Sequence, residues 1–261
     1  MFRGLKMPDK ALVKKRFSRC LETYSGEAEI QLIMAEKLSG MIVRQRTGFR
    51  RVLEIGAGTG LLTALLDKEI SWEQRIVNDL AGDCASFHAS RRNTVFLPGD
   101  AETLDWGNDP FDLVCSSAAF QWFEDLPAFL KKIKSSINQN GLLAFTTFGP
   151  ENLAEIRALT GQSLHYFPLD QLKIVLHSCG FDVLDSSEEV LTRSFGDPLE
   201  ILRTMHRTGV TATSDRTWWT PRRLAEFRRS YRERFGTPEN QVKLTWHPIY
   251  ISAKIRGGDL S

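Results

Sequence analysis

Three glycines occupy five positions in the stretch "VLEIGAGTGLLTALL". The apolar residues before them predict a buried strand over 52–55, and "LLTALL" after them predicts a helix. A strand, a glycine-rich turn and a helix N-terminus together bring backbone groups close to a ligand. Gly56, Gly58 and Gly60 therefore predict a ligand-binding turn. A diphosphate is not indicated, because the dinucleotide fingerprint needs Gly or Ala at Leu61 and no Gly-Lys-Ser/Thr follows.

Three acidic residues fit around this turn. Glu54 lies in the predicted strand, Asp79 ends the next one, and Asp100 follows a third in "GDAE". Asp79 can accept both hydroxyls of a ribose, and Asp100 can accept from the exocyclic amine of adenine. The alternative roles are a helix N-cap for Asp79 and a turn residue for Asp100. Ribose, adenine and a positive charge without phosphate describe S-adenosylmethionine. The residues expected to contact it here are Glu54, Gly56, Ala57, Gly58, Gly60, Asp79, Leu80, Asp100 and Ala101.

These residues must be positioned by alternating strand and helix patterns. Apolar strand-like runs cover 52–55, 75–79, 94–97, 111–116 and 141–148. Helical patterns lie near 59–68, 82–91 and 126–137. Alternation of this kind predicts an α/β fold, in which a mostly parallel sheet has helices on both faces.

The pattern changes after Pro150. "FDVLDSSEEVL" predicts a strand, "PLEILRTMHRTG" and "TPRRLAEFRRSYRERFG" predict two helices, and "VKLTWHPIYISAKI" predicts a closing strand. Pro248 predicts that this strand is an edge strand or contains a bulge. We therefore expect a helical insertion between the last two strands. The predicted divisions are an N-terminal helical segment at 1–48, a donor-binding α/β core at 49–194, the insertion, which would bind substrate or partner, at 195–241, and a final core strand at 242–256.

The composition is that of an ordinary globular protein. Of 261 residues, 42% are hydrophobic and 25% are charged, and the net charge of +2 is too small to indicate a nucleic-acid-binding protein. The four cysteines lie far apart and the five histidines form no metal-binding pattern, so we expect no metal. The N-terminus does not resemble a signal peptide, and no run approaches the roughly 18 apolar residues of a membrane span. We expect a cytoplasmic protein.

Several stretches carry a family resemblance. "VLEIGAGTG" resembles motif I of the class I methyltransferases, and "GDAETLDW" is similar to their segment after the third strand. "RFSRCLETYSGEAEIQ", "SSAAFQWFEDL", "EILRTMHRTGVTA" and "LTWHPIYI" resemble the malonyl-acyl-carrier-protein O-methyltransferases of biotin synthesis. The similarity runs from about Lys14 to Lys254. It implies a Rossmann-like class I methyltransferase fold with a seven-stranded, mostly parallel sheet, and methylation of the free carboxylate of a malonyl thioester.

The resemblance also implies cofactors and partners. S-adenosylmethionine would be the methyl donor and S-adenosylhomocysteine the product, without a metal. The partner would be an acyl carrier protein bearing malonyl-phosphopantetheine, although malonyl-coenzyme A stays open; a monomer without nucleic-acid or membrane contact is expected. Because a carboxylate arrives deprotonated, the main task is alignment and no general base is expected. The alternatives are a methyltransferase for a small free acid such as aconitate, and an RNA-binding protein that keeps the fold.

Further residues are assigned roles on this basis. The N-terminal segment would cover the donor as a lid with Tyr24 and Gln31 at the pocket; a helix that merely packs on the sheet is the alternative. Ser116 would touch the methionine end of the donor. Gln121 and Trp122 would wall the methyl channel and, with Tyr24, position the reactants, unless Trp122 is a core aromatic. "SSAAFQW" lacks the Asn/Asp-Pro-Pro-aromatic motif of amine methylation and the Pro-Cys of pyrimidine methylation.

Basic residues cluster in "RRLAEFRRSYRERF". A solvated helix face is one explanation. The other is docking of an acidic carrier protein by Arg228 and Arg232, because arginine pairs bidentately with carboxylates and phosphates. A cation is also expected to orient the malonyl carboxylate. The candidates, which the sequence does not rank, are Arg193, Arg203, His206 and Arg207.

Overall fold

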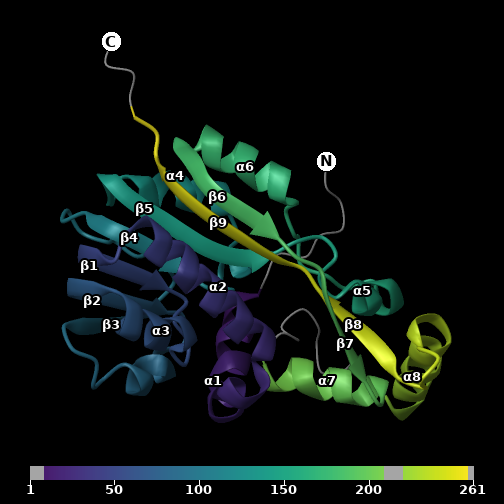
Figure 1. The fold of residues 1–261 in the computed structure, drawn as a ribbon. Helices are drawn as coiled ribbons and strands as arrows, with labels where there is room; N and C mark the ends of the chain where they lie inside the picture. Colours follow the sequence, from purple (N-terminus) through teal and green to yellow (C-terminus); the bar gives the residue numbers. More distant parts are fainter. Residues whose placement is uncertain (1–8, 209–219, 258–261) are drawn as a thin grey trace.

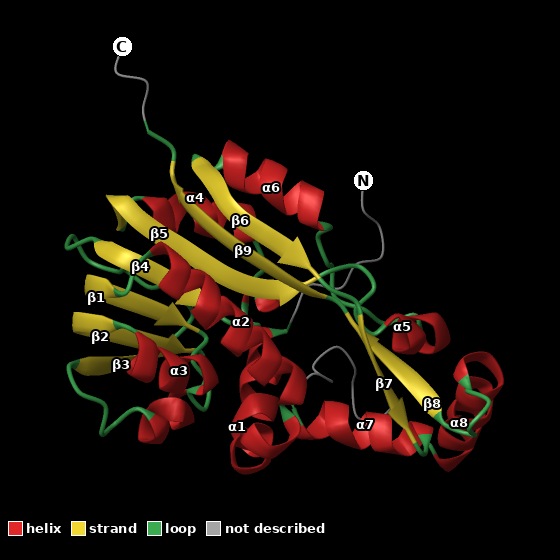
Figure 2. Cartoon of the chain, viewed as in Figure 1, coloured by secondary structure: helices red, strands yellow, loops and turns green. Residues whose placement is uncertain are grey.

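The computed structural model describes residues 9–208 and 220–257, and a seven-stranded sheet forms its centre (Figures 1 and 2). The strands are β1 (Gly48–Ile55), β2 (Ser71–Asp79), β3 (Thr94–Pro98), β4 (Phe111–Ser116), β5 (Ile137–Phe148), β6 (Phe181–Glu188) and β9 (Pro248–Ile255). Their order is β3-β2-β1-β4-β5-β9-β6. The first five are parallel to one another, and β9 runs antiparallel to β5 and β6. The predicted α/β class with a mostly parallel sheet is confirmed.

Helices cover both faces of the sheet. They are α2 (Glu29–Gln45) and α3 (Leu61–Glu69) on one face, and α4 (Leu126–Lys134) and α6 (Leu169–Ser178) on the other. Neighbouring residues of β1 show why both faces are buried. Val52 packs in the cluster with α2 and α3, whereas Leu53 packs in the cluster with α4 and α6. Successive side chains of a strand point to opposite faces, so an unbroken apolar run serves both layers.

Several predicted boundaries differ from the structure, and two of them are informative. The predicted helix at 82–91 is only a short 3₁₀ turn, η1 (Gly82–Phe87). Its sequence begins with Gly and Asp and contains Ser, residues that favour turns over helix interiors. The predicted strand at 141–148 begins earlier, at Ile137, and its pairing with β4 shifts register before Leu142.

The insertion begins and ends in a two-stranded ribbon. β7 (Leu191–Phe195) pairs antiparallel with β8 (Val242–Trp246), and the ribbon packs against α5 (Ala154–Thr160), α7 (Pro198–Arg207) and α8 (Pro221–Phe235). Both predicted insertion helices are present, although 209–219 between them lies outside the described residues. Pro248 was expected on an edge strand or at a bulge. It is instead the first residue of an inner strand, β9, where its missing N–H interrupts little of the ladder.

Two helices precede the sheet in the described part of the chain. α1 (Lys10–Glu27) is capped by Asp9, whose side chain accepts from the Leu12 amide at 3.0 Å. α1 ends before Ala28, where the backbone leaves helical geometry, and α2 follows directly. The predicted segment at 1–48 therefore contains a break, and its residues 1–8 lie outside the described part of the chain. In Figure 1, α1 lies below the carboxyl ends of the central strands and beside α7. Among the described helices, none has the length and apolarity to cross a bilayer.

Candidate functional site

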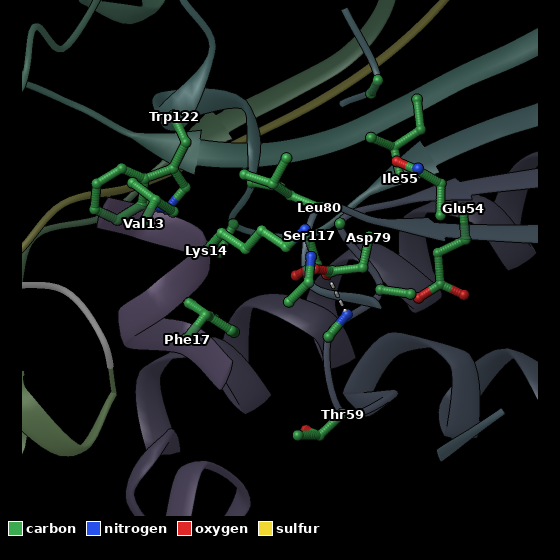
Figure 3. A pocket seen from close by; sticks show the side chains of 18 of the residues that line it. Val13, Lys14, Phe17, Glu54, Ile55, Thr59, Asp79, Leu80, Ser117 and Trp122 are labelled. Carbon is green, nitrogen blue, oxygen red and sulfur yellow. Dashed lines mark hydrogen bonds between the residues drawn. The ribbon is translucent and has the colours of Figure 1, made fainter. Parts of the chain in front are cut away.

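A cavity opens at the carboxyl ends of β1, β2 and β4, and α1 covers one side of it. Figure 3 shows Val13, Lys14 and Phe17 of α1 opposite Glu54 and Asp79 of the strands. We call this the first cavity. Ten of the twelve residues predicted to bind the donor line it, namely Tyr24, Gln31, Glu54, Gly56, Ala57, Gly58, Asp79, Leu80, Asp100 and Ala101.

The other two predicted residues, Gly60 and Ser116, do not line the cavity. Gly60 is the N-cap residue of α3. Ser116 is the last residue of β4 and fully buried, and its hydroxyl has no hydrogen-bond partner among the described residues. Ser117 lines the cavity instead, because the next side chain along an extended chain points to the other side.

The glycine turn has a backbone that only glycine adopts freely. Gly56, Gly58 and Gly60 have φ angles of +67°, +52° and +88°, in the left-handed region. A Cβ atom on Gly56 would lie 2.3 Å from the Cβ of Ala119. The bare backbone thus serves two purposes. It allows the turn, and it lets the segment after β4 approach the cavity closely.

Asp79 holds this turn in place. One carboxylate oxygen accepts from the Gly58 amide at 2.8 Å and the other accepts from the Ala81 amide at 2.8 Å. Burial raises the pKa of Asp79, and these two amide hydrogen bonds lower it. Each carboxylate oxygen has a second lone pair, so the group can also accept from a ligand in the cavity. The local capping role and the binding role are therefore compatible.

Asp100 is joined to α1 by an ion pair. Lys10 Nζ lies 2.6 Å from one Asp100 oxygen and also contacts Glu102. The other Asp100 oxygen accepts from the Glu102 amide at 3.0 Å. Lys10 lines the first cavity as well, and no local pattern predicts this because Lys10 and Asp100 are separated by 90 positions. The ion pair connects the start of α1 to the segment after β3.

Glu54 is a buried acid beside the turn. One of its oxygens accepts from the Thr63 hydroxyl at 2.9 Å, and the other has no hydrogen-bond partner among the described residues. Burial raises the pKa of Glu54 to about 7. Between pH 4.5 and 7 the folded chain therefore holds a proton that the unfolded chain has released.

This difference predicts a pH-dependent stability. Because the folded state binds more protons, raising the pH from 5 to 7.5 should reduce the free energy of unfolding of the ligand-free protein, and the Glu54 contribution over this range is about 2 kcal/mol. Glu54→Gln, which keeps an acceptor for Thr63 but cannot ionise, should remove that contribution. Urea unfolding of both proteins across this pH range measures it. Parallel pH profiles of the two proteins would contradict the assignment.

A second cavity adjoins the first near Trp122. The two share Phe17, Tyr24, Gln31, Ala118 and Trp122. The remaining lining residues of the second cavity are Gln121, Phe148, Asn152, Leu153, Leu164, Tyr166, Thr208 and Trp246. Tyr24 and Gln31 thus meet at both cavities although they lie on different helices. Asn152, Leu164 and Tyr166 come from the segments around α5, and no sequence motif predicts that these segments reach the cavity.

The backbone beside Trp122 is held in an unusual conformation. Ala118 has a φ of +51°, its amide donates to the Thr146 hydroxyl at 2.9 Å, and its carbonyl accepts from Gln121 Nε2 at 2.5 Å. Gln121 Oε1 is buried without a partner among the described residues. A non-glycine residue in this region is strained, and such strain is common at functional sites.

The five basic residues predicted for substrate or partner are spread over the insertion. Arg193 lies 3.0 Å from Glu29 and lines a third cavity between α2, β7 and α7. Arg203 and His206 are exposed on α7. Arg228 and Arg232 both contact Asp197, at 2.5 and 3.0 Å. The structure therefore does not bring these five side chains together with Trp122 and Tyr24. Arg207, also considered, pairs with Glu27 at 2.6 Å.

The described residues contain no group of three or more His, Cys, Asp or Glu side chains suited to hold a metal ion. The four cysteines form no disulfide and are buried.

Comparison with known proteins shows similarity to methyltransferases. The family model described as "Methyltransferase domain" matches residues 14–186. Proteins named malonyl-[acyl-carrier protein] O-methyltransferase are similar over nearly the whole chain. That of Porphyromonas gingivalis is 38% identical over 253 residues, covering 96% of this chain and 98% of its own. That of Bacteroides fragilis is 38% identical over 254 residues, covering 95% of this chain and 51% of its own, so this chain spans about half its length.

Solved structures share the fold at low identity. The YcgJ protein of Bacillus subtilis has a TM-score of 0.60 with 16% identity, covering 85% of this chain and 100% of that one. The 1,6-didemethyltoxoflavin-N1-methyltransferase of Burkholderia thailandensis, solved with S-adenosylhomocysteine, has a TM-score of 0.57 with 13% identity, covering 98% and 94%. At these identities the likeness shows the fold.

Proposed function

The chain belongs to the family of malonyl-[acyl-carrier protein] O-methyltransferases, and on that premise we propose that it transfers a methyl group from S-adenosylmethionine to the free carboxylate of a malonyl thioester. The products are a methyl ester and S-adenosylhomocysteine. The observation that carries the proposal is the joined pair of cavities. The first is built around a bare backbone turn with a buried carboxylate, and the second lies directly beyond Trp122.

The residues of the first cavity fit the donor. Asp79 offers free lone pairs to the ribose hydroxyls while its other lone pairs hold the turn. Gly56 and Gly58 line the cavity and carry no side chain, so a nucleoside can approach the backbone at these two positions. Asp100 is placed to accept from an adenine amine, on lone pairs that Lys10 and the Glu102 amide leave free. When bound, the donor supplies an electrophilic methyl group on a cationic sulfur.

The chain's own residues align the acceptor and exclude water. Tyr24, Gln121 and Trp122 lie at the junction of the two cavities or beside it, and we assign them this positioning role. Alignment of two bound reactants can contribute about 7–11 kcal/mol in favourable cases. A malonyl carboxylate is ionised at neutral pH, so the reaction needs no base from the protein.

The acceptor thioester is proposed to be carried by an acyl carrier protein, as the names of the relatives state for those proteins. By the resemblance described above, the methyl ester would enter biotin synthesis, where masking one carboxylate lets malonyl act as a primer. A cytoplasmic location belongs to the same proposal, since four cysteines without a disulfide suit a reducing compartment. The alternatives of a small free acid or of RNA are not favoured by these relatives.

The test is mass spectrometry of malonyl-carrier protein after incubation with the enzyme and isotopically labelled S-adenosylmethionine. A gain of one labelled methyl group on the malonyl-phosphopantetheine is expected. Malonyl-coenzyme A, free malonate and aconitate are the comparison acceptors. Methylation of a free acid in preference to both thioesters would overturn the proposed substrate.

The arginines of α8 lead to a prediction about docking. Asp197 caps α7 by accepting from the Leu199 amide at 2.9 Å, and it also binds Arg228 and Arg232. Arg228→Glu with Arg232→Glu should therefore lower the free energy of unfolding by about 1–2 kcal/mol and raise KM for the carrier-bound substrate for two reasons at once.

A second pair of arginines on α8 separates an effect on stability from an effect on carrier docking. Arg222 and Arg229 are 89% and 72% exposed, and their ion pairs with described residues are to Glu226 and Glu233 of their own helix. Exposed pairs of this spacing contribute about 0.3–0.5 kcal/mol, so Arg222→Glu with Arg229→Glu should leave stability nearly unchanged. A severalfold higher KM for malonyl-carrier protein, with malonyl-coenzyme A unaffected, is expected if α8 docks the carrier. An unchanged KM would remove α8 from the docking surface.

A further inference from the structure

The second cavity contains a phenol whose hydrogen-bonding direction is set by its neighbours. Asn152 is buried, and its Oδ1 accepts from the His247 amide at 3.4 Å. A backbone amide can only donate, so the oxygen of the Asn152 amide must face His247 and its nitrogen must face the other way. That nitrogen donates to the Tyr166 hydroxyl at 3.0 Å. The Tyr166 oxygen is therefore the acceptor in this bond, and its own proton points elsewhere.

His247 is itself fixed. Its Nδ1 accepts from the Glu151 amide at 3.1 Å, so the ring proton is on Nε2, which lies 3.0 Å from a Glu188 oxygen. A Cβ atom on Gly149 would lie 2.7 Å from the ring, so the chain from Gly149 to Asn152 can wrap around it only with glycine there. The "WHP" stretch at the start of β9 thus anchors the loop that carries Asn152.

Hydrophobic packing also fixes the position of the Tyr166 ring. The ring packs against the cluster of Ile30, Met34, Phe148 and Tyr250, beside Ala118. Its hydroxyl makes no second hydrogen bond with a described residue. Burial raises the pKa of Tyr166 to about 12, so the hydroxyl keeps its proton at any physiological pH. The result is a rigid, neutral donor in the wall of the cavity next to Trp122.

We propose that Tyr166, oriented by Asn152, donates a hydrogen bond to one oxygen of the acceptor carboxylate and leaves the other oxygen free to attack the methyl group. This inference rests on the proposed function, since it places the malonyl carboxylate in the second cavity. Asn152 is a positioning residue. It acts only by fixing where the Tyr166 proton points.

A neutral donor suits this reaction better than a cation does. As the oxygen–carbon bond forms, the carbon–sulfur bond breaks with its electron pair leaving on sulfur, and both the carboxylate and the sulfonium lose their charge. A cation paired with the carboxylate would stabilise the ground state more than the transition state, which slows the chemical step. A phenol fixes the carboxylate with less of this penalty, and after reaction it donates to the carbonyl oxygen of the ester.

Tyr166→Phe tests the proposal, since it keeps the ring and removes only the hydroxyl. We expect kcat/KM for the malonyl thioester to fall about ten- to hundredfold, the range for a hydrogen bond to a charged group. The affinity of the enzyme–S-adenosylhomocysteine complex for malonyl-pantetheine, measured by calorimetry, should fall with it. The affinity for S-adenosylhomocysteine alone should not change, because Tyr166 does not line the first cavity.

Two further variants complete the experiment. Asn152→Asp keeps an acceptor for His247 but turns the Tyr166 proton toward the new carboxylate, so it should reduce acceptor affinity while Tyr166 is intact. The double variant should be no worse than Tyr166→Phe alone, because both changes remove one donor. Tyr250→Phe is the matched control. It removes a buried hydroxyl, which has no partner among the described residues, from the same cluster, and it should behave as wild type.

The outcomes separate this inference from the function it rests on. If wild-type enzyme methylates malonyl-carrier protein and Tyr166→Phe matches it in kcat/KM and acceptor affinity, the Tyr166 assignment is wrong while the function stands. If Asn152→Asp matches wild type but Tyr166→Phe does not, the orienting role of Asn152 is wrong. If the wild type methylates no malonyl thioester, the proposed function itself fails.

Discussion

Replacing Asp79 with alanine is expected to weaken binding of S-adenosylhomocysteine at least about a hundredfold. The change removes the acceptors of two buried amides, Gly58 and Ala81, and leaving each unsatisfied costs about 1–3 kcal/mol. It also removes the acceptor proposed for the ribose hydroxyls, so the turn loses its shape and its ligand contact together. Isothermal titration calorimetry with S-adenosylhomocysteine measures the effect.

Asp105→Ala is the control for this experiment. Asp105 also accepts from a backbone amide, that of Gly107 at 2.9 Å, but on an exposed turn away from the first cavity. The variant should bind S-adenosylhomocysteine as wild type does. An Asp79→Ala protein that is folded and retains wild-type affinity would disprove the binding role of the turn.

Gly56→Ala is expected to destabilise the fold by about 2–5 kcal/mol. A left-handed backbone costs a non-glycine residue about 1–2 kcal/mol, and overpacking against Ala119 at 2.3 Å costs a further 1–3 kcal/mol. Urea unfolding of the ligand-free protein measures the sum. The same variant should lose affinity for S-adenosylhomocysteine, because relieving the contact requires the segment after β4 to move.

Two further variants separate the backbone contribution from the steric contribution to the loss of stability in Gly56→Ala. Gly107 also has a positive φ, +74°, but nothing lies within 4 Å of a Cβ placed there, so Gly107→Ala should lose only the backbone share, about 1 kcal/mol. Ala119→Gly combined with Gly56→Ala should recover the steric share relative to Ala119→Gly alone. A Gly56→Ala protein as stable as Gly107→Ala would show that the close approach is not what excludes a side chain.

The sheet could be predicted because local patterns encode it. Apolar runs such as the one before Gly56 repeat at the spacing of strands between helices, and an acid after each of two strands must lie near the turn when the strands are parallel. Asp79 and Asp100 were placed at the first cavity for that reason, and both line it. The periodic signal was weaker where residues favour turns, as in η1, and there the prediction was wrong.

The rest of the site depends on contacts between distant segments. Lys10 reaches Asp100 across the first cavity. At the second cavity, Asn152 binds both Tyr166 and His247, and His247 lies 95 positions from Asn152. No local period records such pairs. The arginines of α8 show a related limit. Their number suggested a docking face, but the sequence does not reveal that Asp197 lies between two of them.

The β7–β8 ribbon has a mechanical consequence. β6 leads into β7 after two residues and β8 leads into β9 after one, and the Glu189 amide donates to the Pro248 carbonyl at 3.0 Å where these junctions meet. The insertion is therefore joined to the main sheet through these short connections, and Figure 1 shows β7 and β8 continuing the course of β6 and β9. Any swing of α7 or α8 toward the first cavity must bend paired strands, so the position of the insertion relative to that cavity is set by β-structure rather than by a flexible linker.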